Sequence, residues 1–374
     1  QLRRRVLNLA ANLPVRPSHL PIGERILIIR PDHLGDVLLT TPAIVALRAA
    51  LPDAEIHALV GPWSAEVIAS YPEVDLALTV PFPGFSRSPK KSWRSPYELA
   101  LNTARHLRRI GYSSVVIMRP DHWWGALVAH LAGIPQRIGF DLPEVTPFLT
   151  QTHPLRPQHV VLQNLQLIEQ WTGKLAAAAQ RYYFPVDPLD QVYIDGYLEE
   201  WGIAAGQPVL CIHPGTGTWV KHWPEERWSD VADTLGEQLN LPVVFTGSNT
   251  ELPLVRRIVD RMKQPSIVMA GDTRVGQLAA LFKRARVVLG PDSGPLHLAV
   301  AVGAPTVTLF GPADPIEFGP WGSPNRHLVL TSGIACRPCR VLDWGADDPA
   351  YHPCLRDITV ARVLEAARRA ANSG

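Results

Sequence analysis

The sequence predicts an α/β protein with two domains, each built on a parallel sheet covered by helices. Three observations support this prediction. Short apolar runs rich in β-branched residues alternate with segments of helical spacing along most of the chain. Many of these runs end in turns of glycine and polar residues, as the strands of α/β folds do. Finally, 374 residues exceed what one ordinary hydrophobic core holds, so two domains are expected.

The first half of the chain contains four predicted strands, at residues 26–29, 54–60, 74–80 and 114–118. Helical spacing follows at residues 37–50, 65–70, 97–110 and 158–173. Between them, PFPGFSRSPKKSWRSP at residues 81–96 is rich in proline, glycine, serine and basic residues, which predicts a loop. Turn-forming residues also dominate 175–191, and we place the junction between the two domains there.

The same alternation restarts in the second half. Strands are predicted at residues 208–212, 242–245, 266–269, 286–289 and 306–310, and helices at 225–239, 252–263, 275–284 and 296–302. We therefore expect a first domain of residues 1–180, a second of residues 181–356 and a last segment, 357–374, that forms a helix. Two parallel sheets in tandem leave a central cleft faced by the carboxyl ends of their strands, where α/β proteins bind ligands.

Composition bounds the class of protein. Hydrophobic content of 46% and charged content of 19% are typical of a well-packed globular protein. Residues 1–180 carry 18 Lys and Arg against 13 Asp and Glu, whereas residues 181–374 carry 18 against 21. The first half would suit an anionic partner, although ordinary scatter of solvated charges explains the difference equally well. We expect no nucleic acid among the partners.

The expected location is the cytoplasm. No apolar run reaches the roughly 20 residues that span a bilayer, and four cysteines without a secretory signal indicate a reducing compartment. The stretch QLRRRVLNLAANLPVRP, residues 1–17, either forms a short basic helix that contacts the inner face of the membrane or is a loosely packed arm. We favour the arm, which leaves peripheral membrane contact open.

Several well-known site motifs are missing from the sequence. Neither GxGxxG nor GxxxxGK[ST] follows any predicted strand, which argues against a dinucleotide-binding dehydrogenase and a P-loop ATPase. The zinc motif HExxH and the nucleophile motif GxSxG are also missing.

Three turns of the second half combine glycines with polar side chains at predicted strand ends: residues 213–224, 246–251 and 290–315. In the first turn Gly215 allows close approach of the backbone to a ligand, Thr216 and Thr218 add hydroxyl groups, and Lys221 adds a positive charge. In the third, a helix opens at Gly294, where free N–H groups and the helix dipole attract an anion. Together the turns favour a nucleotide diphosphate as ligand.

Acidic residues beside these donors suit sugar hydroxyls. Asp292 is placed to accept from a sugar, Glu251 from a ribose, and His297 belongs to the same predicted donor site. Simpler interpretations exist for some of these residues. Asp292 and Ser293 suit helix capping, and Lys221 suits a surface charge beside two glutamates.

The first half carries polar turns of its own. The strand at 26–29 leads into RPDHLGD, which contains Asp32 and Asp36, and the strand at 114–118 leads into RPDHWWG. Basic residues of this half suit phosphates or acidic sugars of an acceptor, or are plain surface charges: Lys90, Lys91, Arg94, Arg119 and Arg137.

Three segments in order resemble glycosyltransferase family nine, the ADP-heptose:lipopolysaccharide heptosyltransferases: RPDHLGDVLLTTPAIVALRAALPDAEI, HPGTGTWVKHWP and PDSGPLHLAVAVGAPTVTLFGPADP. The resemblance implies a GT-B architecture of two Rossmann-like domains, an acceptor domain followed by a nucleotide-sugar domain, with the helix of 357–372 returning to the first. It also implies inverting transfer of a heptose from an ADP-sugar to an anionic lipopolysaccharide-core or other envelope glycan, without a cofactor or an essential metal.

The resemblance also assigns roles to individual residues. The aspartate of the family's LGD motif acts as general base, which corresponds to Asp36, with Gly35 beside the acceptor. Lys221 and the N–H groups of Ser293 and Gly294 would stabilise the departing diphosphate. Asp292 corresponds to the family aspartate near the sugar hydroxyls.

The turn before Asp36 departs from the family pattern. Small polar residues usually stand where this chain has Asp32 and His33. A second carboxylate would raise the pKa of Asp36, or Asp32 is a helix N-cap, which we prefer. His33 could pair with either acid. The loop with Thr216 and Thr218 also differs in length from some relatives.

A cluster near the end of the chain has spacing that would suit zinc: Cys336, Cys339, His352 and Cys354. Structural zinc, reduced thiols and a local disulfide all remain open, the last two together being favoured. Two alternatives to the transferase also stay open: a non-catalytic sugar-nucleotide or glycan-binding protein, and a sugar-nucleotide epimerase, which would need a different set of acids.

Overall fold

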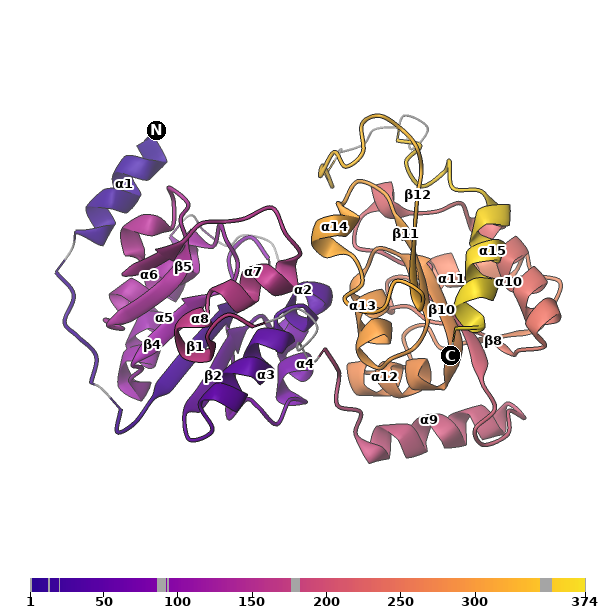
Figure 1. The fold of residues 1–374 in the computed structure, drawn as a ribbon, viewed down its shortest axis with the longest axis horizontal. Coiled ribbons are helices and arrows are strands. Elements are labelled where there is room, and N and C mark those ends of the chain that lie inside the picture. The colour runs from indigo at the N-terminus through magenta and orange to yellow at the C-terminus, as the bar shows by residue number, and fades with distance from the viewer. Residues whose placement is uncertain are drawn as a thin grey trace. The chain divides into compact units, whose positions relative to one another are not determined.

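A computed structural model describes residues 2–12, 14–19, 21–85, 92, 94–175, 182–343 and 352–373 of the chain. The chain divides into two compact units, Gln1–Arg181 and Tyr182–Gly374 (Figure 1). The expected junction at residue 180 lies beside this division. Each unit contains its own six-stranded sheet and its own hydrophobic core.

The sheet of the first unit is parallel throughout, with the strand order β3-β2-β1-β4-β5-β6. Its strands are β1 (Arg25–Arg30), β2 (Glu55–Val60), β3 (Leu76–Thr79), β4 (Ser114–Ile117), β5 (Gln136–Phe140) and β6 (Gln151–His153). Ile29 of β1 lies opposite Ile117 of β4. The strand order reverses between these two strands, so their carboxyl ends form the topological switch point where open α/β sheets bind ligands.

Helices cover this sheet: α1 (Leu2–Ala11), α2 (Leu34–Leu38), α3 (Thr41–Ala50), α4 (Ala65–Ala69), α5 (Ser95–Ile110), α6 (Trp123–Leu131), α7 (Val160–Gln166) and α8 (Glu169–Thr172), with 3-10 turns η1 (Pro62–Ser64) and η2 (Thr146–Phe148).

The favoured interpretation of the N-terminal stretch as a loose arm is wrong. Residues Leu2–Ala11 are helical, and Leu7 is buried in the same core cluster as Phe148.

The single helix expected at residues 37–50 is in fact two helices, α2 and α3. Pro42 stands in the first turn of α3, where its missing N–H costs no hydrogen bond but prevents a continuous ladder from α2. Thr40, between the helices, donates its hydroxyl to the carbonyl of Asp36 at 2.9 Å. This break keeps Asp36 in a helix of five residues directly behind the strand end.

The second sheet repeats the first topology, with the order β12-β11-β10-β7-β8-β9. Its strands are β7 (Val209–Ile212), β8 (Val243–Phe245), β9 (Ser266–Val268), β10 (Ala285–Pro291), β11 (Thr306–Phe310) and β12 (His327–Thr331). Counted from β7, this is again the order 3-2-1-4-5-6 of doubly wound folds. The switch point of this unit therefore lies at the ends of β7 and β10, where Leu289 pairs with Ile212.

The helices of the second unit are α9 (Pro188–Glu200), α10 (Glu225–Leu239), α11 (Leu252–Val259), α12 (Val275–Arg284), α13 (Gly294–Ala301), α14 (Pro315–Phe318) and α15 (Val360–Ala371), with a 3-10 turn η4 (Trp219–Lys221). In the described parts of the chain, no helix has the length and apolar character needed to cross a membrane.

The last helix corrects one expectation. The helix within residues 357–372 was expected to return to the first domain, but α15 packs against α10 and against β10, β11 and β12 of the second unit (Figure 1). Val363, Ala367 and Ala370 are buried in the core of that unit. The sequence shows that this helix has an apolar face but not which domain covers it.

Candidate active site

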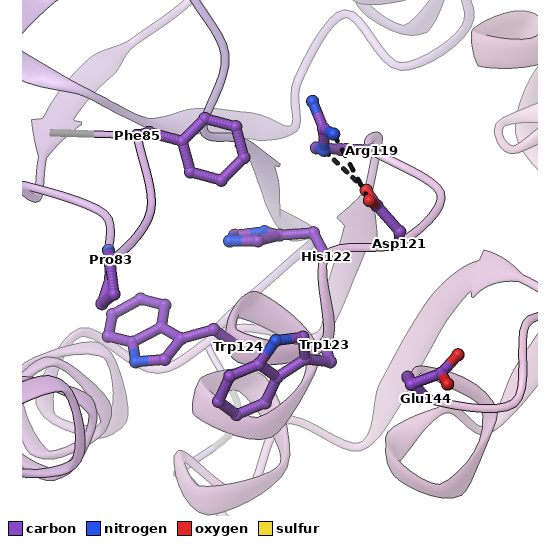
Figure 2. A pocket seen from close by; sticks show the side chains of 8 residues that line it. All are labelled: Pro83, Phe85, Arg119, Asp121, His122, Trp123, Trp124 and Glu144. Atoms are coloured by element: carbon purple, nitrogen blue, oxygen red, sulfur yellow. Dashed lines mark hydrogen bonds and ion pairs between the residues drawn. The ribbon is translucent and has the colours of Figure 1, made fainter. Parts of the chain in front are cut away.

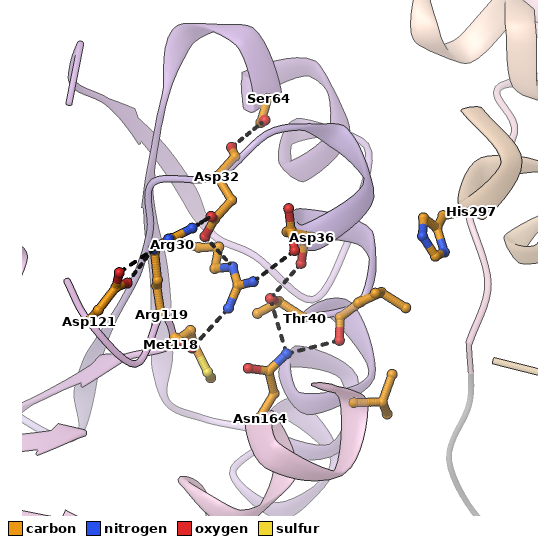
Figure 3. Close-up of polar contacts among 12 residues, drawn as sticks. Arg30, Asp32, Asp36, Thr40, Ser64, Met118, Arg119, Asp121, Asn164 and His297 are labelled. Atoms are coloured by element: carbon orange, nitrogen blue, oxygen red, sulfur yellow. Dashed lines mark hydrogen bonds and ion pairs between the residues drawn. The ribbon is translucent and has the colours of Figure 1, made fainter. Parts of the chain in front are cut away.

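Five charged side chains meet at the switch point of the first unit (Figure 3). The Nε of Arg30, at the end of β1, lies 2.7 Å from Oδ2 of Asp32, and its Nη2 lies 3.4 Å from Oδ1 of Asp36. Asp32 also pairs with Arg119, whose Nε lies 2.6 Å from Oδ1 of Asp121. The result is a continuous charged chain, Asp36–Arg30–Asp32–Arg119–Asp121, which runs across the ends of β1 and β4.

The two carboxylates nearest Arg30 differ in their access to solvent. The Asp36 side chain, in the first turn of α2, is 38% exposed, whereas that of Asp32 is 3% exposed. Asp36 therefore combines a guanidinium partner with an edge that is open to solvent. Gly35 precedes it in the same helix.

The preferred interpretation of Asp32 as a helix N-cap is wrong. The N-cap position of α2 is occupied by His33, whose side chain makes no capping hydrogen bond, and the carboxylate of Asp32 pairs with two arginines instead. Because Arg30 lies between the two carboxylates, its charge offsets the repulsion expected between them. The ring of His33 lies 5.2 Å from that of Trp63, centroid to centroid.

A pocket of about 330 Å³ lies at this end of the first unit. Its lining is shown in Figure 2 and consists of Pro83, Phe85, Arg119, Asp121, His122, Trp123, Trp124 and Glu144. The guanidinium carbon of Arg119 lies 5.0 Å from the centroid of the Phe85 ring. Arg119 thus reaches both the buried charged chain and the wall of the pocket.

The other basic residues predicted to bind the acceptor lie in different environments. Arg137 lies near the start of β5 and donates to the backbone carbonyls of Ile134 and Phe148, so the prediction that it contacts the acceptor is not supported. Burial lowers the pKa of Arg137. Arg94 is exposed at the N-terminus of α5. Lys90 and Lys91 lie outside the described residues.

In the second unit, Lys221 and Asp292 form a close ion pair at the ends of β7 and β10. Nζ lies 2.5 Å from Oδ2, and the side chains are only 13% and 7% exposed. The interpretation of Lys221 as a surface charge is therefore wrong. The other carboxylate oxygen of Asp292 lies 3.9 Å from Nε2 of His297, on α13. The pair places a cation and an acid beside the first turn of that helix.

The interpretation of Ser293 as a simple helix cap is also wrong. Ser293 holds the N-cap position of α13 in an extended conformation, but its side chain makes no capping hydrogen bond. Its hydroxyl oxygen is buried and has no hydrogen-bond partner within the described residues. Because buried polar atoms are normally paired, a hydroxyl in this state suits a ligand that completes the pairing. Gly294 opens the helix directly after it.

Gly215 and Glu251 bring two of the predicted loops together. A Cβ atom on Gly215 would lie 2.2 Å from the carboxyl carbon of Glu251, so no larger residue fits without movement of that acid. Oε2 of Glu251 accepts from both the N–H and the hydroxyl of Ser248, at 2.7 Å each. Burial alone would raise the pKa of Glu251, but the nearby His213 and the Ser248 donors hold it below its ordinary value.

The threonines of the first loop differ in their contacts. The hydroxyl of Thr218 donates to the carbonyl of Leu342 at 2.6 Å and so anchors the loop, while Thr216 is half-buried.

The cysteines near the end of the chain are free thiols in this structure: Cys336, Cys339 and Cys354. Across the parts of the chain that the structure describes, no group of three or more His, Cys, Asp or Glu is placed to hold a metal ion. Burial raises the pKa of Cys354, and the ring of His352 packs 5.4 Å from that of Trp219.

Comparison with known proteins decides the family. Residues 100–343 match the sequence model of glycosyltransferase family 9 (heptosyltransferase). The chain belongs to glycosyltransferase family 9. It is 28% identical to lipopolysaccharide heptosyltransferase 1 of Pseudomonas aeruginosa, over 91% of this chain and 97% of that protein. It is 24% identical to lipopolysaccharide heptosyltransferase 2 of Escherichia coli, over the same shares of the two chains. The protein is a heptosyltransferase-like glycosyltransferase, as the resemblance predicted.

Solved structures confirm the GT-B fold class. A family 9 glycosyl transferase from Veillonella parvula superposes with a TM-score of 0.78 at 24% identity, covering 96% of this chain and 99% of that one. ADP-heptose lipopolysaccharide heptosyltransferase II of E. coli gives 0.71 at 22% identity, covering 93% and 98%. E. coli heptosyltransferase WaaC, solved with ADP-2-deoxy-2-fluoro heptose, gives 0.66 at 20% identity, covering 91% and 98%.

No role was predicted from the sequence for two residues of the glycosyltransferase's first unit: Arg30, at the centre of the charged chain, and His122, in the pocket. One signal was available. The tetrapeptide Arg-Pro-Asp-His occurs twice, at residues 30–33 and 119–122, each time after a predicted strand. If the two strands are neighbours, the arginine of one copy lies within reach of the aspartate of the other, as Arg119 and Asp32 show.

Proposed function

We propose that this glycosyltransferase moves a heptose from ADP-heptose to a lipopolysaccharide-core acceptor, with inversion at the anomeric carbon and without a metal ion. The observation that carries the proposal is the buried Lys221–Asp292 pair beside the first turn of α13. The names of the relatives support the acceptor class, and the ADP-heptose analogue bound to E. coli WaaC supports the donor. No cofactor is required, because the nucleotide sugar already carries an activated anomeric carbon.

The second unit would bind the donor. As the bond between the anomeric carbon and the diphosphate breaks, negative charge develops on the departing ADP. Lys221 and the N–H groups of Ser293 and Gly294 would stabilise that charge, supplying what a divalent cation would otherwise supply. Asp292 would orient Lys221 and accept from a sugar hydroxyl, and Glu251 would accept from the ribose.

The first unit would bind the acceptor and supply the base. The acceptor oxygen forms a bond to the anomeric carbon on the face opposite the diphosphate, and Asp36 takes the hydroxyl proton. A single attack of this kind inverts the configuration. Arg30 supports Asp36 by holding its carboxylate in place at 3.4 Å. The exposed Arg94 suits an anionic group of the acceptor, which fits a protein working at the inner face of the cytoplasmic membrane.

Substitution of the base tests this mechanism. The full chain is incubated with ADP-heptose and a core acceptor that lacks the transferred heptose, and the product linkage is determined by NMR. Asp36→Asn should lower kcat by about 10²–10⁴-fold and leave ADP-heptose affinity unchanged, because Asn keeps the shape but cannot accept the proton. Asp53→Asn, at an exposed site outside the switch point, serves as the matched control.

Each alternative outcome has a distinct meaning. Transfer by the Asp36→Asn variant at the wild-type rate would show that the base is wrong. Donor binding without transfer by the wild-type protein would favour the non-catalytic sugar-nucleotide-binding alternative. Conversion of ADP-heptose to a stereoisomer without acceptor would favour the epimerase.

A further inference from the structure

The break between α2 and α3 takes away the backbone donors that two carbonyls would have in a continuous helix. In an unbroken α-helix each carbonyl accepts from the N–H four residues later. The partner of Leu38 would be residue 42, a proline without an N–H group. The partner of Leu39 would be Ala43, whose N–H donates to the carbonyl of Thr40 instead, at 3.0 Å. Because buried carbonyls are normally paired, other donors are expected here.

Two side chains supply these donors. The hydroxyl of Thr41 donates to the carbonyl of Leu38 at 2.8 Å. The side-chain amide of Asn164, on α7, donates to the carbonyl of Leu39 at 3.0 Å and to the hydroxyl oxygen of Thr40 at 3.3 Å (Figure 3). Asn164 therefore caps a helix break that lies 125 residues away from it in the sequence.

The contact reaches Asp36 through one more hydrogen bond. The Thr40 hydroxyl that accepts from Asn164 donates to the carbonyl of Asp36 at 2.9 Å, and hydrogen bonds linked in this way strengthen one another. Helix α2 has only five residues, too few to be stable in isolation, so its position depends on tertiary contacts. Arg30 pairs with the carboxylate of Asp36, whereas Asn164 acts on its main chain.

The amide oxygen of Asn164 indicates that this residue is not optimised for stability. Asn164 is 1% exposed, and its amide nitrogen makes two donations. Its Oδ1 is buried and has no hydrogen-bond partner in the part of the chain that the structure describes. A buried acceptor without a donor destabilises a fold, and an apolar side chain of similar shape would avoid that cost. The unpaired oxygen thus fits a polar residue that is kept for activity.

We infer that Asn164 is a positioning residue for Asp36. Its amide, acting with the Thr40 hydroxyl, fixes the main chain of α2 and so the place from which the Asp36 carboxylate takes the acceptor proton. The inference rests on the proposed function, which makes Asp36 the base. Reaction rates depend strongly on such placement, since a displacement of about 1 Å can lower a rate about 10²-fold.

Two matched substitutions on α7 test the role of Asn164. Asn164→Leu removes both donations together with the unpaired oxygen. Gln163→Leu, the control, removes two donations from a buried amide to the carbonyls of Arg156 and Gln158, at 3.2 and 2.9 Å. Asn164→Leu should resist urea at least as well as Gln163→Leu. Its kcat should nevertheless fall about 10–10²-fold, with KM for ADP-heptose unchanged, while Gln163→Leu keeps the wild-type kcat.

Thr40 supplies a second test, which does not require the Asn164 variant to fold. Thr40→Val removes the hydroxyl and keeps the branched shape, whereas Thr40→Ser keeps the hydroxyl and loses a methyl group. Thr40→Val should be slowed about as much as Asn164→Leu, and Thr40→Ser should transfer at close to the wild-type rate. The double variant Asn164→Leu/Thr40→Val should be no slower than either single variant, because both remove the same link.

Hydrogen exchange gives a readout that needs no transfer reaction. The N–H of Leu39 donates to the carbonyl of Gly35 at 3.0 Å, and the N–H of Thr40 donates to that of Val37 at 3.0 Å. Both N–H groups should exchange about tenfold faster in Asn164→Leu than in Gln163→Leu, because loss of the cap lets α2 open more often. Equal exchange in the two variants would show that Asn164 does not hold α2.

The outcomes separate this inference from the proposed function. Three results overturn the inference: a wild-type kcat in Asn164→Leu, equal slowing of Asn164→Leu and Gln163→Leu, or slowing of Thr40→Ser to the level of Thr40→Val. If Asp36→Asn is inactive in the same assay, the proposed function survives each of them. Transfer by Asp36→Asn at the wild-type rate, or no transfer by the wild-type protein, overturns both.

Discussion

The side chains of Arg30 and Asp32 form an ion pair in which both groups are almost fully buried. Removing two charges from water is costly, so such a pair persists only where further contacts compensate. Arg30 donates to the carbonyl of Met118 at 2.8 Å, and Asp32 has Arg119 as a second cation. Asp32 thus pairs with two arginines, and one of them, Arg30, also pairs with Asp36.

Asp32→Asn should therefore weaken both stability and catalysis. Removing one partner of a buried pair typically costs about 3–5 kcal/mol, because the other charge stays buried and unpaired. Urea unfolding measures this loss, and kcat should fall with KM for ADP-heptose unchanged, since the proposed donor site is in the other unit. Glu225→Gln, which breaks the exposed pair with Arg257, should cost less than about 1 kcal/mol. An Asp32 variant no less stable than this control would contradict the buried network.

The role of Asp32 also shows what the local sequence could not predict. An aspartate just before a helix is typical of an N-cap, and local spacing offers no reason to doubt it. The contact that decides its role comes from Arg119, which is 87 residues away and becomes a neighbour only because β1 pairs with β4. Most of the apolar strands were predictable from their composition, but β5, QRIGF, and β12, HLVLT, were missed. The short polar strand β6, QTH, carries no apolar pattern and was missed as well.

The second unit was easier to predict. Its strands β7, VLCI, and β11, TVTLF, are buried throughout and rich in apolar and β-branched residues, and each expected loop follows a strand end. Proximity of Lys221 to Asp292 was implied by shared placement at strand carboxyl ends, since β7 and β10 are neighbours. The ion pair itself was not predicted, because a lysine beside glutamates in the sequence is equally typical of an exposed charge.

Lys221 should prove important for both stability and turnover. Lys221→Met leaves Asp292 buried without its cation, which should cost about 3–5 kcal/mol of unfolding free energy. In the proposed mechanism the same change removes charge stabilisation of the departing diphosphate, so it should lower kcat by about 10²–10³-fold. The double variant Lys221→Met/Asp292→Asn should regain most of the stability without regaining activity. Recovery of transfer together with stability would show that Lys221 has only a structural role.

Gly215→Ala should weaken donor binding. The new methyl group would lie 2.2 Å from the carboxyl carbon of Glu251, so either the loop or the acid must move. ADP titration should show a loss of affinity with little change in circular dichroism. Gly196→Ala is the matched control, because nothing lies within 4 Å of its added Cβ and the site is within α9. That control should raise helix stability by up to about 1 kcal/mol. Unchanged ADP affinity in Gly215→Ala would remove this loop from the donor site.

Buried histidines should make the protein less stable in mild acid. Burial lowers the pKa of His327 to about 4, below the value of about 6.5 for an unfolded chain. Between these values the unfolded chain binds a proton that the folded chain does not, so unfolding becomes more favourable as the pH falls. One such histidine contributes a slope of about 1.4 kcal/mol per pH unit. The contribution is fully present only above pH 6.5 and is lost progressively down to pH 4. Urea titrations at several pH values measure the slope of the unfolding free energy against pH. The slope should be smaller in His327→Gln, whose side chain can still bond Thr306. It should be unchanged in His106→Gln, at an exposed position of α5. Equal slopes in the wild-type protein and His327→Gln would mean that His327 takes up its proton in the folded state.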